Sequence, residues 1–367
     1  MMVNQDKWWV RALIGSAQML FLVGILVAAV MLFGSATDQR ILTVFLINVV
    51  AAIALQIYTG SSGVISFGHV GFMALGAYGS ALFTADPAIK AAAIPNAPAF
   101  ILNAALSFLP AMLIGISVAA AVAVVIGRVF VRLGGSAAAV ATLGFMVMIF
   151  TILSNAEELT RGAKVFSGIP AYTTIGWCMG AFAAILVIAR LLRESDIGLG
   201  LRSSRDDAIA AQASGVDIVN SRYAMWVVSA AGSAVAGALY AHYIGAILPK
   251  AFHFELTFLL VTMVIVGGPS ITGAVVGTLL ITVLAEALRR LENGFSLGFF
   301  KLNEAPGLTT AVLALLIVLT LTLRPQGLVG RWEIDDLVKR WLAKRRKASA
   351  MLTAPFHKGR KVNPAPQ

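Results

Sequence analysis

Few side chains in this sequence of 367 residues have the types and spacing that catalysis or metal binding requires. Cys178 is the single cysteine, whereas a disulfide framework or a thiolate cluster needs several thiols. The histidines are scattered and lack the H-x-x-x-H spacing that places two metal ligands on one helix face: His69, His242, His253 and His357. We therefore predict no catalytic residue and no metal site, and an enzyme is the least favoured class of function.

A glycine-rich segment, residues 58–80, is the stretch best suited to a close helix contact or a narrow path. Its glycines recur eight residues apart, a little over two helical turns, in two series: Gly60, Gly68 and Gly76, and Gly63, Gly71 and Gly79. In lipid, small residues let helix backbones approach closely, so the pattern predicts a tightly packed helix pair. The alternative is that this backbone also lines the path of a transported solute. Both interpretations extend to Ser66, Phe72, Tyr78, Gly267 and Gly268.

His69 lies inside this segment and has two interpretations of its own. A histidine within a membrane span is by default a candidate functional residue. Because Gly60 and Gly63 favour a loop nearby, the imidazole is equally well explained as reaching interfacial water.

A polar segment over residues 194–220 is predicted to contain a short helix at 204–214. Ser204 and Asp207 have the spacing of a capping box, and Gly215 can supply a left-handed stop. The surface of this helix is small-sided, because it carries Ala208, Ala210, Ala211 and Ala213. With arginines beside it, such a helix suits docking into a cleft on a partner protein. The alternative is a structural loop helix that touches no partner.

The composition places these segments in a membrane protein. Hydrophobic residues make up 59% of the chain and charged residues 12%, with a mean hydropathy of +0.88, whereas soluble domains are roughly 45–50% apolar and about 25% charged. A spanning helix needs about 20 apolar residues. Ten stretches are long enough or nearly so: 12–33, 41–58, 64–84, 108–131, 136–153, 175–192, 222–246, 256–267, 271–288 and 307–323.

These stretches predict an all-α, polytopic membrane protein with about ten spans. The first is too long for the apolar core of a signal peptide and is interpreted as a retained helix. The stretch 256–267 is short and ends at Gly267-Gly268-Pro269, which breaks regular structure, so we expect one short or broken span.

The net charge of +11 is concentrated after residue 323, where eleven Lys and Arg stand against three Asp and Glu. The positive-inside rule then places both termini in the cytoplasm. We divide the chain into a transmembrane domain, residues 1–330, and a basic cytoplasmic tail, residues 331–367. Such a tail is expected to lie against anionic lipid, and we expect no binding of nucleic acid.

Two kinds of residue pattern that are absent from the sequence limit the energy sources that this chain could use. The sequence contains no G-x-x-x-x-G-K-[ST] phosphate loop, so the chain does not hydrolyse ATP by that route. The central parts of the expected spans also lack the acids and bases that proton- and sodium-coupled carriers use.

The sequence resembles the permease subunits of branched-chain amino-acid ABC importers over residues 40–330. Four ordered segments carry the resemblance: G-x-x-G-x-x-S-x-G-x-x-x-F-x-x-x-G-A-Y from Gly60 to Tyr78, the polar segment at 195–217, Ala234 to Tyr240, and Val266 to Gly273. The resemblance implies two ATP-binding subunits that carry ATP and Mg²⁺, a second homologous permease subunit and an external solute-binding protein. It also implies the bacterial inner membrane, and no cofactor in this chain.

The polar segment looks like the coupling helix of that family. It matches the E-A-A-x-x-x-G pattern of ABC importers in part, because Ile209 stands where the acid is expected. The residues expected to couple ATPase movement to the spans are Arg202, Arg205, Asp206, Asp207, Ala210, Ala211 and Gly215.

The sequence is compatible with more than one substrate and more than one mode of transport. Leucine, isoleucine and valine lead by resemblance, while urea and short amides use similar permeases. A stand-alone channel or secondary carrier is the chief rival, and it predicts transport without nucleotide. A binding protein is expected to dock on loops at 85–107, 154–174, 247–255 and 292–306.

Overall fold

A computed structural model describes residues 8–292, 296–297, 300–301 and 307–336. Most of the expected docking loop at 292–306 and the tail beyond residue 336 lie outside this range.

The expected helical membrane fold is confirmed. Eight helical segments are long and apolar enough to cross a membrane: α1 (Trp8–Phe33), α2 (Ala36–Ser62), α6 (Phe108–Phe130), α7 (Gly135–Asn155), α9 (Ile175–Glu194), α12 (Ile218–Ile244), Pro249–Gly267 and α14 (Ile271–Glu292). The seventh comprises the 3₁₀ turn η2 (Pro249–Phe252) and α13 (Phe254–Gly267). The remaining two expected spans are 16-residue helices, α3 (His69–Thr84) and α15 (Leu308–Leu323).

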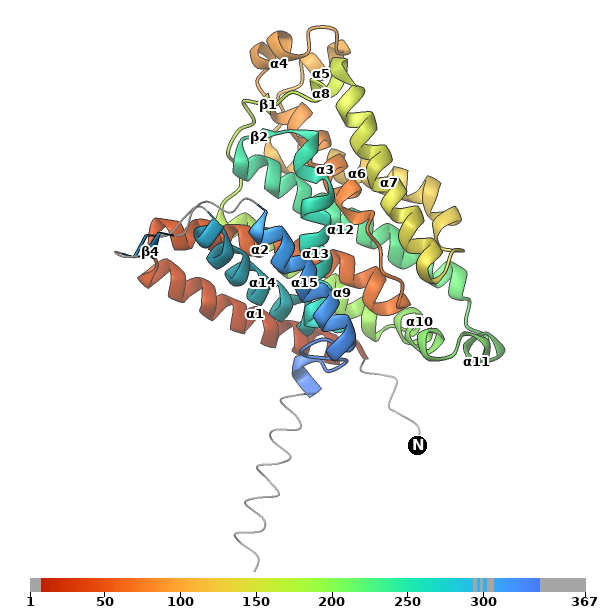
Figure 1. The fold of residues 1–367 in the computed structure, drawn as a ribbon. Helices are drawn as coiled ribbons and strands as arrows, with labels where there is room; N and C mark the ends of the chain where they lie inside the picture. Colours follow the sequence, from red (N-terminus) through yellow and green to blue (C-terminus); the bar gives the residue numbers. More distant parts are fainter. Residues whose placement is uncertain (1–7, 293–295, 298–299, 302–306, 337–367) are drawn as a thin grey trace, which may run out of the picture.

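Short elements gather at two places on the bundle (Figure 1). At the top lie α4 (Pro87–Ala93), α5 (Ala99–Leu102), α8 (Glu157–Thr160) and the antiparallel pair β1 (Phe166–Ser167) and β2 (Ala246–Ile247). At the lower right lie α10 (Asp196–Asp206) and α11 (Ala208–Ala213). A second antiparallel pair, β3 (Ser296–Leu297) and β4 (Phe300–Lys301), connects α14 to α15. We name the two gatherings the α4–α5 end and the α10–α11 end.

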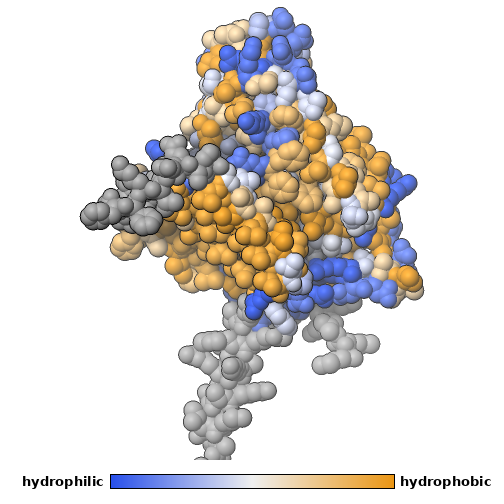
Figure 2. Space-filling view, viewed as in Figure 1, coloured by the Kyte–Doolittle hydropathy of each residue, from blue (hydrophilic) through white to orange (hydrophobic). Residues whose placement is uncertain are grey.

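Helices α2 and α12 form the centre of the bundle, and α1 lies at its edge. In their most apolar windows, 89% of α2 is buried inside the protein but only 17% of α1. Hydrophobic side chains cover most of the visible surface, while hydrophilic side chains collect at the top and along the lower right edge (Figure 2). This band of exposed apolar residues is the surface that lipid would cover.

Glycines bring α3 into direct backbone contact with its neighbours. A Cβ on Gly76 would collide with the backbone of Ala234 in α12, and one on Gly237 would collide with the backbone of Met73 in α3. A Cβ on Gly115 of α6 would in turn meet the backbone of Gly76. Because lipid tails are as apolar as the helices, close packing of this kind stabilises helix association in membranes.

Backbone conformation decides two of the predicted boundaries, of which one was wrong and one is confirmed. The expected span 64–84 begins only at His69, because Gly63 ends α2 with φ +71° and residues 63–68 are not helical. L-residues with a side chain rarely adopt that left-handed region. The expected break after Gly267 is present, where Gly268 has φ +104°.

The single short helix expected at 204–214 was also wrong. Ser204 lies within α10, where its hydroxyl donates to Leu201 O, and Ser195 caps α10 instead. Asp207 is extended, and its carboxylate accepts hydrogen bonds from Ile209 N at 2.9 Å and Ala210 N at 3.0 Å. That cap starts α11 as a separate helix, and Gly215 follows it with φ +85°.

The packing around Gly76 generates the first prediction. Gly76→Ala should destabilise the protein by about 1–3 kcal/mol, since the added methyl group overpacks a backbone contact. The measurement is the thermal unfolding midpoint of the purified chain in detergent. Gly144→Ala on α7 is the matched control, because a Cβ there has no atom within 4 Å. Equal midpoints for the two variants would contradict this account of the helix contact.

Candidate functional site

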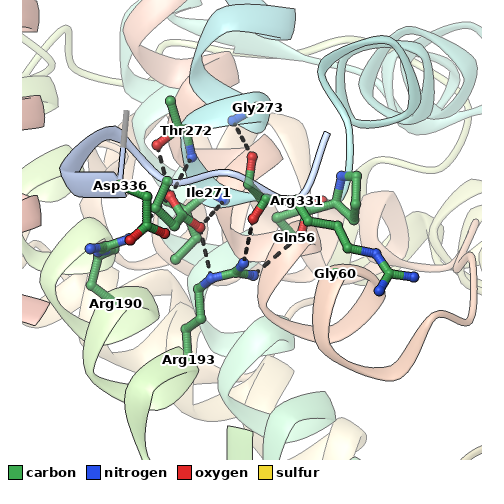
Figure 3. A network of polar contacts seen from close by, with 12 residues as sticks. Gln56, Gly60, Arg190, Arg193, Ile271, Thr272, Gly273, Arg331 and Asp336 are labelled. Atoms are coloured by element: carbon green, nitrogen blue, oxygen red, sulfur yellow. Dashed lines mark hydrogen bonds and ion pairs between the residues drawn. The ribbon is translucent and has the colours of Figure 1, made fainter. Parts of the chain in front are cut away.

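Two buried arginines lie at the last turn of α9. Arg190 and Arg193 are three residues apart and therefore share a helix face, and they are only 2% and 7% exposed. Figure 3 shows both side chains directed toward Ile271 and Thr272 at the start of α14. Two guanidinium groups buried on one face require negative partners, because an uncompensated buried charge is strongly unfavourable.

Glu333 supplies most of that compensation. One of its carboxylate oxygens lies 3.0 Å from Arg190 Nη1, and the other lies 2.7 Å from Arg193 Nε. Both contacts are ion pairs by distance, although the N–H groups are not aligned for hydrogen bonding. Asp335 adds an aligned contact of 2.6 Å to Arg190 Nη2.

The same carboxylate caps the first turn of α14. Ile271 N donates to Glu333 at 2.9 Å, Thr272 N at 3.1 Å and the Thr272 hydroxyl at 2.7 Å. The first amides of a helix have no partner within the helix and carry a partial positive charge. Glu333 therefore connects the chain after α15 to both α9 and α14.

Further contacts tie α10 to this junction. The Arg205 guanidinium donates to Gly60 O at the end of α2 at 3.3 Å, and Asp206 pairs with Arg331 at 3.0 Å. Arg193 donates to Pro269 O at 3.3 Å, at the break between α13 and α14. A displacement of α10 would therefore act on the end of α2 through Arg205 and on the segment after α15 through Asp206. We name this set of contacts the arginine junction.

A cavity of about 170 Å³ lies beside the arginine junction. Its lining brings together predicted site residues that are far apart in sequence: Gly60, Gly63, Arg205 and Gly268. Gln56 and Thr59 line it too; Gln56 Nε2 donates to Gly268 O at 3.2 Å. Gln56 Oε1 and the Thr59 hydroxyl are buried with no hydrogen-bond partner.

A second group of predicted residues lies deeper in the bundle, around His69. The imidazole is 3% exposed and contacts Ser66 Oγ at 2.8 Å and Ser229 Oγ at 2.5 Å. Ser229 donates its only hydroxyl hydrogen to Ala54 O, so the tautomer with hydrogen on Nε2 satisfies this bond. Aromatic rings of Tyr58, Phe72 and Trp226 surround the imidazole.

The imidazole therefore does not reach interfacial water and instead joins α3 to α12 through Ser229. Gly71 packs against Phe145 of α7. Tyr78 lies against Phe252 of η2, with ring centroids 6.5 Å apart. These contacts belong to helix packing, away from the cavity at the arginine junction.

The expected coupling residues lie along α10 and α11. Arg202 is half-buried, and burial lowers its pKa to about 10, with the Arg193 cation lowering it further, so it remains charged at neutral pH. Ala210 is exposed and Ala211 is buried. Arg205 and Asp206 have partners within the chain, and Asp207 caps α11.

Sequence reasoning missed Glu333, Arg190 and Arg193 as site residues. The sequence predicted no role in a site for the two arginines, and Glu333 falls in the segment 331–367 that was predicted to be a basic cytoplasmic tail. The available signal was the group of three acids, Glu333, Asp335 and Asp336, in an otherwise basic segment.

Comparison with known proteins agrees with the sequence motifs. The family model described as branched-chain amino acid transport system / permease component matches residues 39–321. The chain is 27% identical to the high-affinity branched-chain amino acid transport system permease protein LivM of Escherichia coli (strain K12), over 89% of this chain and 79% of that protein. LivM of Salmonella typhimurium has the same identity and coverage.

A more distant relative is the probable branched-chain amino acid transport permease protein LivH of Methanocaldococcus jannaschii. It is 24% identical over 51% of this chain and 60% of that protein. No solved structure matches the chain.

The second prediction concerns the arginine junction. Glu333→Gln should destabilise the protein by about 3–5 kcal/mol, because it leaves two buried guanidinium groups without their shared anion. The measurement is the thermal unfolding midpoint in detergent. Asp206→Asn is the control: its pair with Arg331 is exposed on both sides, so its loss should have little effect. A midpoint for Glu333→Gln as high as that of the control would show that the buried pairs contribute nothing.

Proposed function

Because this chain belongs to the family of permease components of branched-chain amino acid transport systems, we propose that it is the membrane-spanning subunit of an ATP-driven importer for these amino acids. Energy comes from two separate ATP-binding subunits that carry ATP and Mg²⁺, since this sequence has no phosphate loop. A second, homologous permease subunit completes the membrane part. The assembly lies in a bacterial inner membrane.

One observation carries the coupling role: Ile209 on α11 is 81% exposed. In Figure 1, α11 lies at the extremity of the α10–α11 end, away from the long helices. Burying an isoleucine side chain contributes about 1.5–3 kcal/mol. An apolar side chain presented on a short, capped helix suits insertion into a cleft on an ATP-binding subunit. Coupling therefore uses an apolar contact where the general pattern of importers has an acid.

The arginine junction supplies the route from α11 to the spans. Movement of α11 passes through Asp207 to α10, and Arg205 and Asp206 transmit it to Gly60 and to the segment after α15. These two residues then brace the coupling helices, while Ile209 and Ala210 face the partner. Because α2 and α13 both end at glycines beside the junction, a rigid-body shift of α10 can reorient them there.

The orientation of the chain in the membrane follows from the distribution of its positive charges. The α10–α11 end carries Arg193, Arg202 and Arg205 and precedes the basic tail, so it faces the cytoplasm together with both termini. The α4–α5 end then faces outward and receives an external solute-binding protein.

Lys90 makes that outer end rigid. Its ammonium is buried and donates to Leu82 O at 3.2 Å, to Ile101 O at 2.6 Å and to Ala104 O. Burial lowers the pKa of Lys90. These bonds hold α4 and α5 against the end of α3, as a fixed docking surface requires.

The third prediction tests this assignment. Ile209→Ser should reduce ATP-driven leucine uptake about tenfold or more in vesicles that contain the complete transporter, because it removes the apolar contact with the ATP-binding subunit. Membrane insertion and thermal stability should be unchanged. Val219→Ser is the matched control, since Val219 is also an exposed aliphatic residue, 41% exposed, but belongs to α12.

Two results would contradict the proposal. Normal uptake by Ile209→Ser would remove α11 from the coupling route. Leucine uptake by this chain reconstituted without nucleotide would replace the importer with a channel or secondary carrier.

A further inference from the structure

A chamber of about 570 Å³ lies between α2, α13, α14 and α15. None of the residues expected from sequence to couple the ATPase or to line the solute path lies in its wall, although Glu255 and Glu292 belong to the expected docking loops. Its volume falls within the roughly 300–1,000 Å³ typical of small-molecule sites.

The depth of the chamber can be estimated along three of its helices, and the three estimates are similar. Arg40, Glu255 and Arg289 lie at its outer rim, near the start of α2, the start of α13 and the end of α14. Asn48, Met263 and Thr282 line it seven or eight residues further along the same helices, toward the α10–α11 end. At 1.5 Å per residue, the floor lies about 10–12 Å below the rim on each helix.

The wall between rim and floor is apolar. It is formed by side chains from α2, α13 and α15: Ile41, Val44, Phe258, Leu259 and Leu313. A solute that fills the chamber would therefore bury an apolar group along this wall.

The floor carries two polar side chains without partners. The Thr282 side chain is 8% exposed, and its hydroxyl is buried without a hydrogen-bond partner. The Asn48 side chain is 6% exposed and makes no hydrogen bond to a described residue. Leaving a buried polar group unsatisfied costs about 1–3 kcal/mol. Neighbouring Thr278, one turn away on α14, instead donates to Ala274 O at 2.7 Å. The unpaired groups at the floor indicate that a ligand with donors and acceptors occupies it.

The rim carries charges of both signs. Arg40 and Glu255 have no ion-pair partner among the described residues, while Glu286 pairs with Arg289 at 2.6 Å and Arg290 at 3.2 Å. A rim of this kind attracts a molecule that bears both a positive and a negative group.

An apolar cluster lies next to the floor. Ala52 and Leu55 of α2 pack with Val261 and Val264 of α13, and on α2 the first two stand between Asn48 of the chamber and Gln56 of the cavity beside the arginine junction. The two spaces therefore lie along one seam between α2 and α13.

We propose that this chamber is the site at which the permease holds its solute, and that the solute is a zwitterionic amino acid with an apolar side chain. The Asn48 amide and the Thr282 hydroxyl bind its ammonium and carboxylate groups, and its side chain lies against Val44, Leu259 and Leu313. Urea has no apolar group that could pack against this wall. The assignment rests on the proposed function, because the orientation and the class of solute come from it.

The test is protection of an introduced thiol. Val44→Cys places a reactive group on the chamber wall, in a Cys178→Ala background that removes the single native thiol. The complete transporter in membrane vesicles is labelled with a charged methanethiosulfonate reagent, without nucleotide or binding protein. L-Leucine should slow labelling several-fold, and urea should have no effect.

Thr282→Val added to this background should raise the leucine concentration for half-protection about tenfold, the loss expected for one hydrogen bond to a charged group. Thr278→Val is the matched control and should change nothing, because its hydroxyl is already bonded within α14. Failure of leucine to protect, equal protection by urea, or an equal effect of the two threonine variants would overturn the assignment. Labelling that responds to the acyl-chain length of the lipid but not to leucine would identify a lipid site instead.

This experiment separates the two proposals. Protection by leucine without ATP-dependent uptake would keep the chamber and refute ATP-driven import. ATP-dependent uptake without protection would keep the importer and refute the chamber.

Discussion

Glu333 sits where two buried guanidinium groups and the first amides of α14 converge, and its charge makes each of these features possible. Arg190 and Arg193 would be too costly to bury alone, and the start of α14 has no capping side chain of its own apart from Ser270, which accepts only from Gly273 N. The Glu333 carboxylate forms ion pairs with both guanidinium groups and also accepts hydrogen bonds from the first amides of α14. As a result, the ends of α9 and α14 and the segment after α15 are held at fixed positions around α10.

Glycine provides the complementary freedom. Where α2 and α13 end beside the arginine junction, Gly63 and Gly268 adopt left-handed backbone conformations that other residues rarely reach. Deeper in the bundle, Gly76 and Gly237 remove side chains so that α3 and α12 touch through their backbones. The protein thus has a rigid centre, and its helices α2 and α13 end at glycines on the side where a partner would act. That division of roles is what a subunit driven from one side of the membrane requires.

The two cavities along the α2–α13 seam extend this arrangement. Each is lined by polar groups that have no partner among the described residues, and the apolar cluster of Ala52, Leu55, Val261 and Val264 lies on the same seam. A shift at the arginine junction would act on the same two helices, because Arg205 donates to Gly60 O in α2 and Arg193 donates to Pro269 O just after α13. Movement driven by the ATP-binding subunits and binding of the solute would then both involve α2 and α13.

The sequence by itself determined the fold class, the approximate position of all ten apolar helices and the family, because hydrophobic run length and short glycine motifs are local properties. It also located the polar segment at 194–220, although Asp207 rather than Ser204 caps the helix that carries Ile209. Only the tertiary structure decided that His69 is a buried link between helices, that Glu333 joins Arg190 and Arg193, and that Asn48 and Thr282 share one chamber. The physical reason is that each of these depends on which groups lie unpaired or opposed across helices far apart in sequence, and one-dimensional patterns carry no information about that pairing.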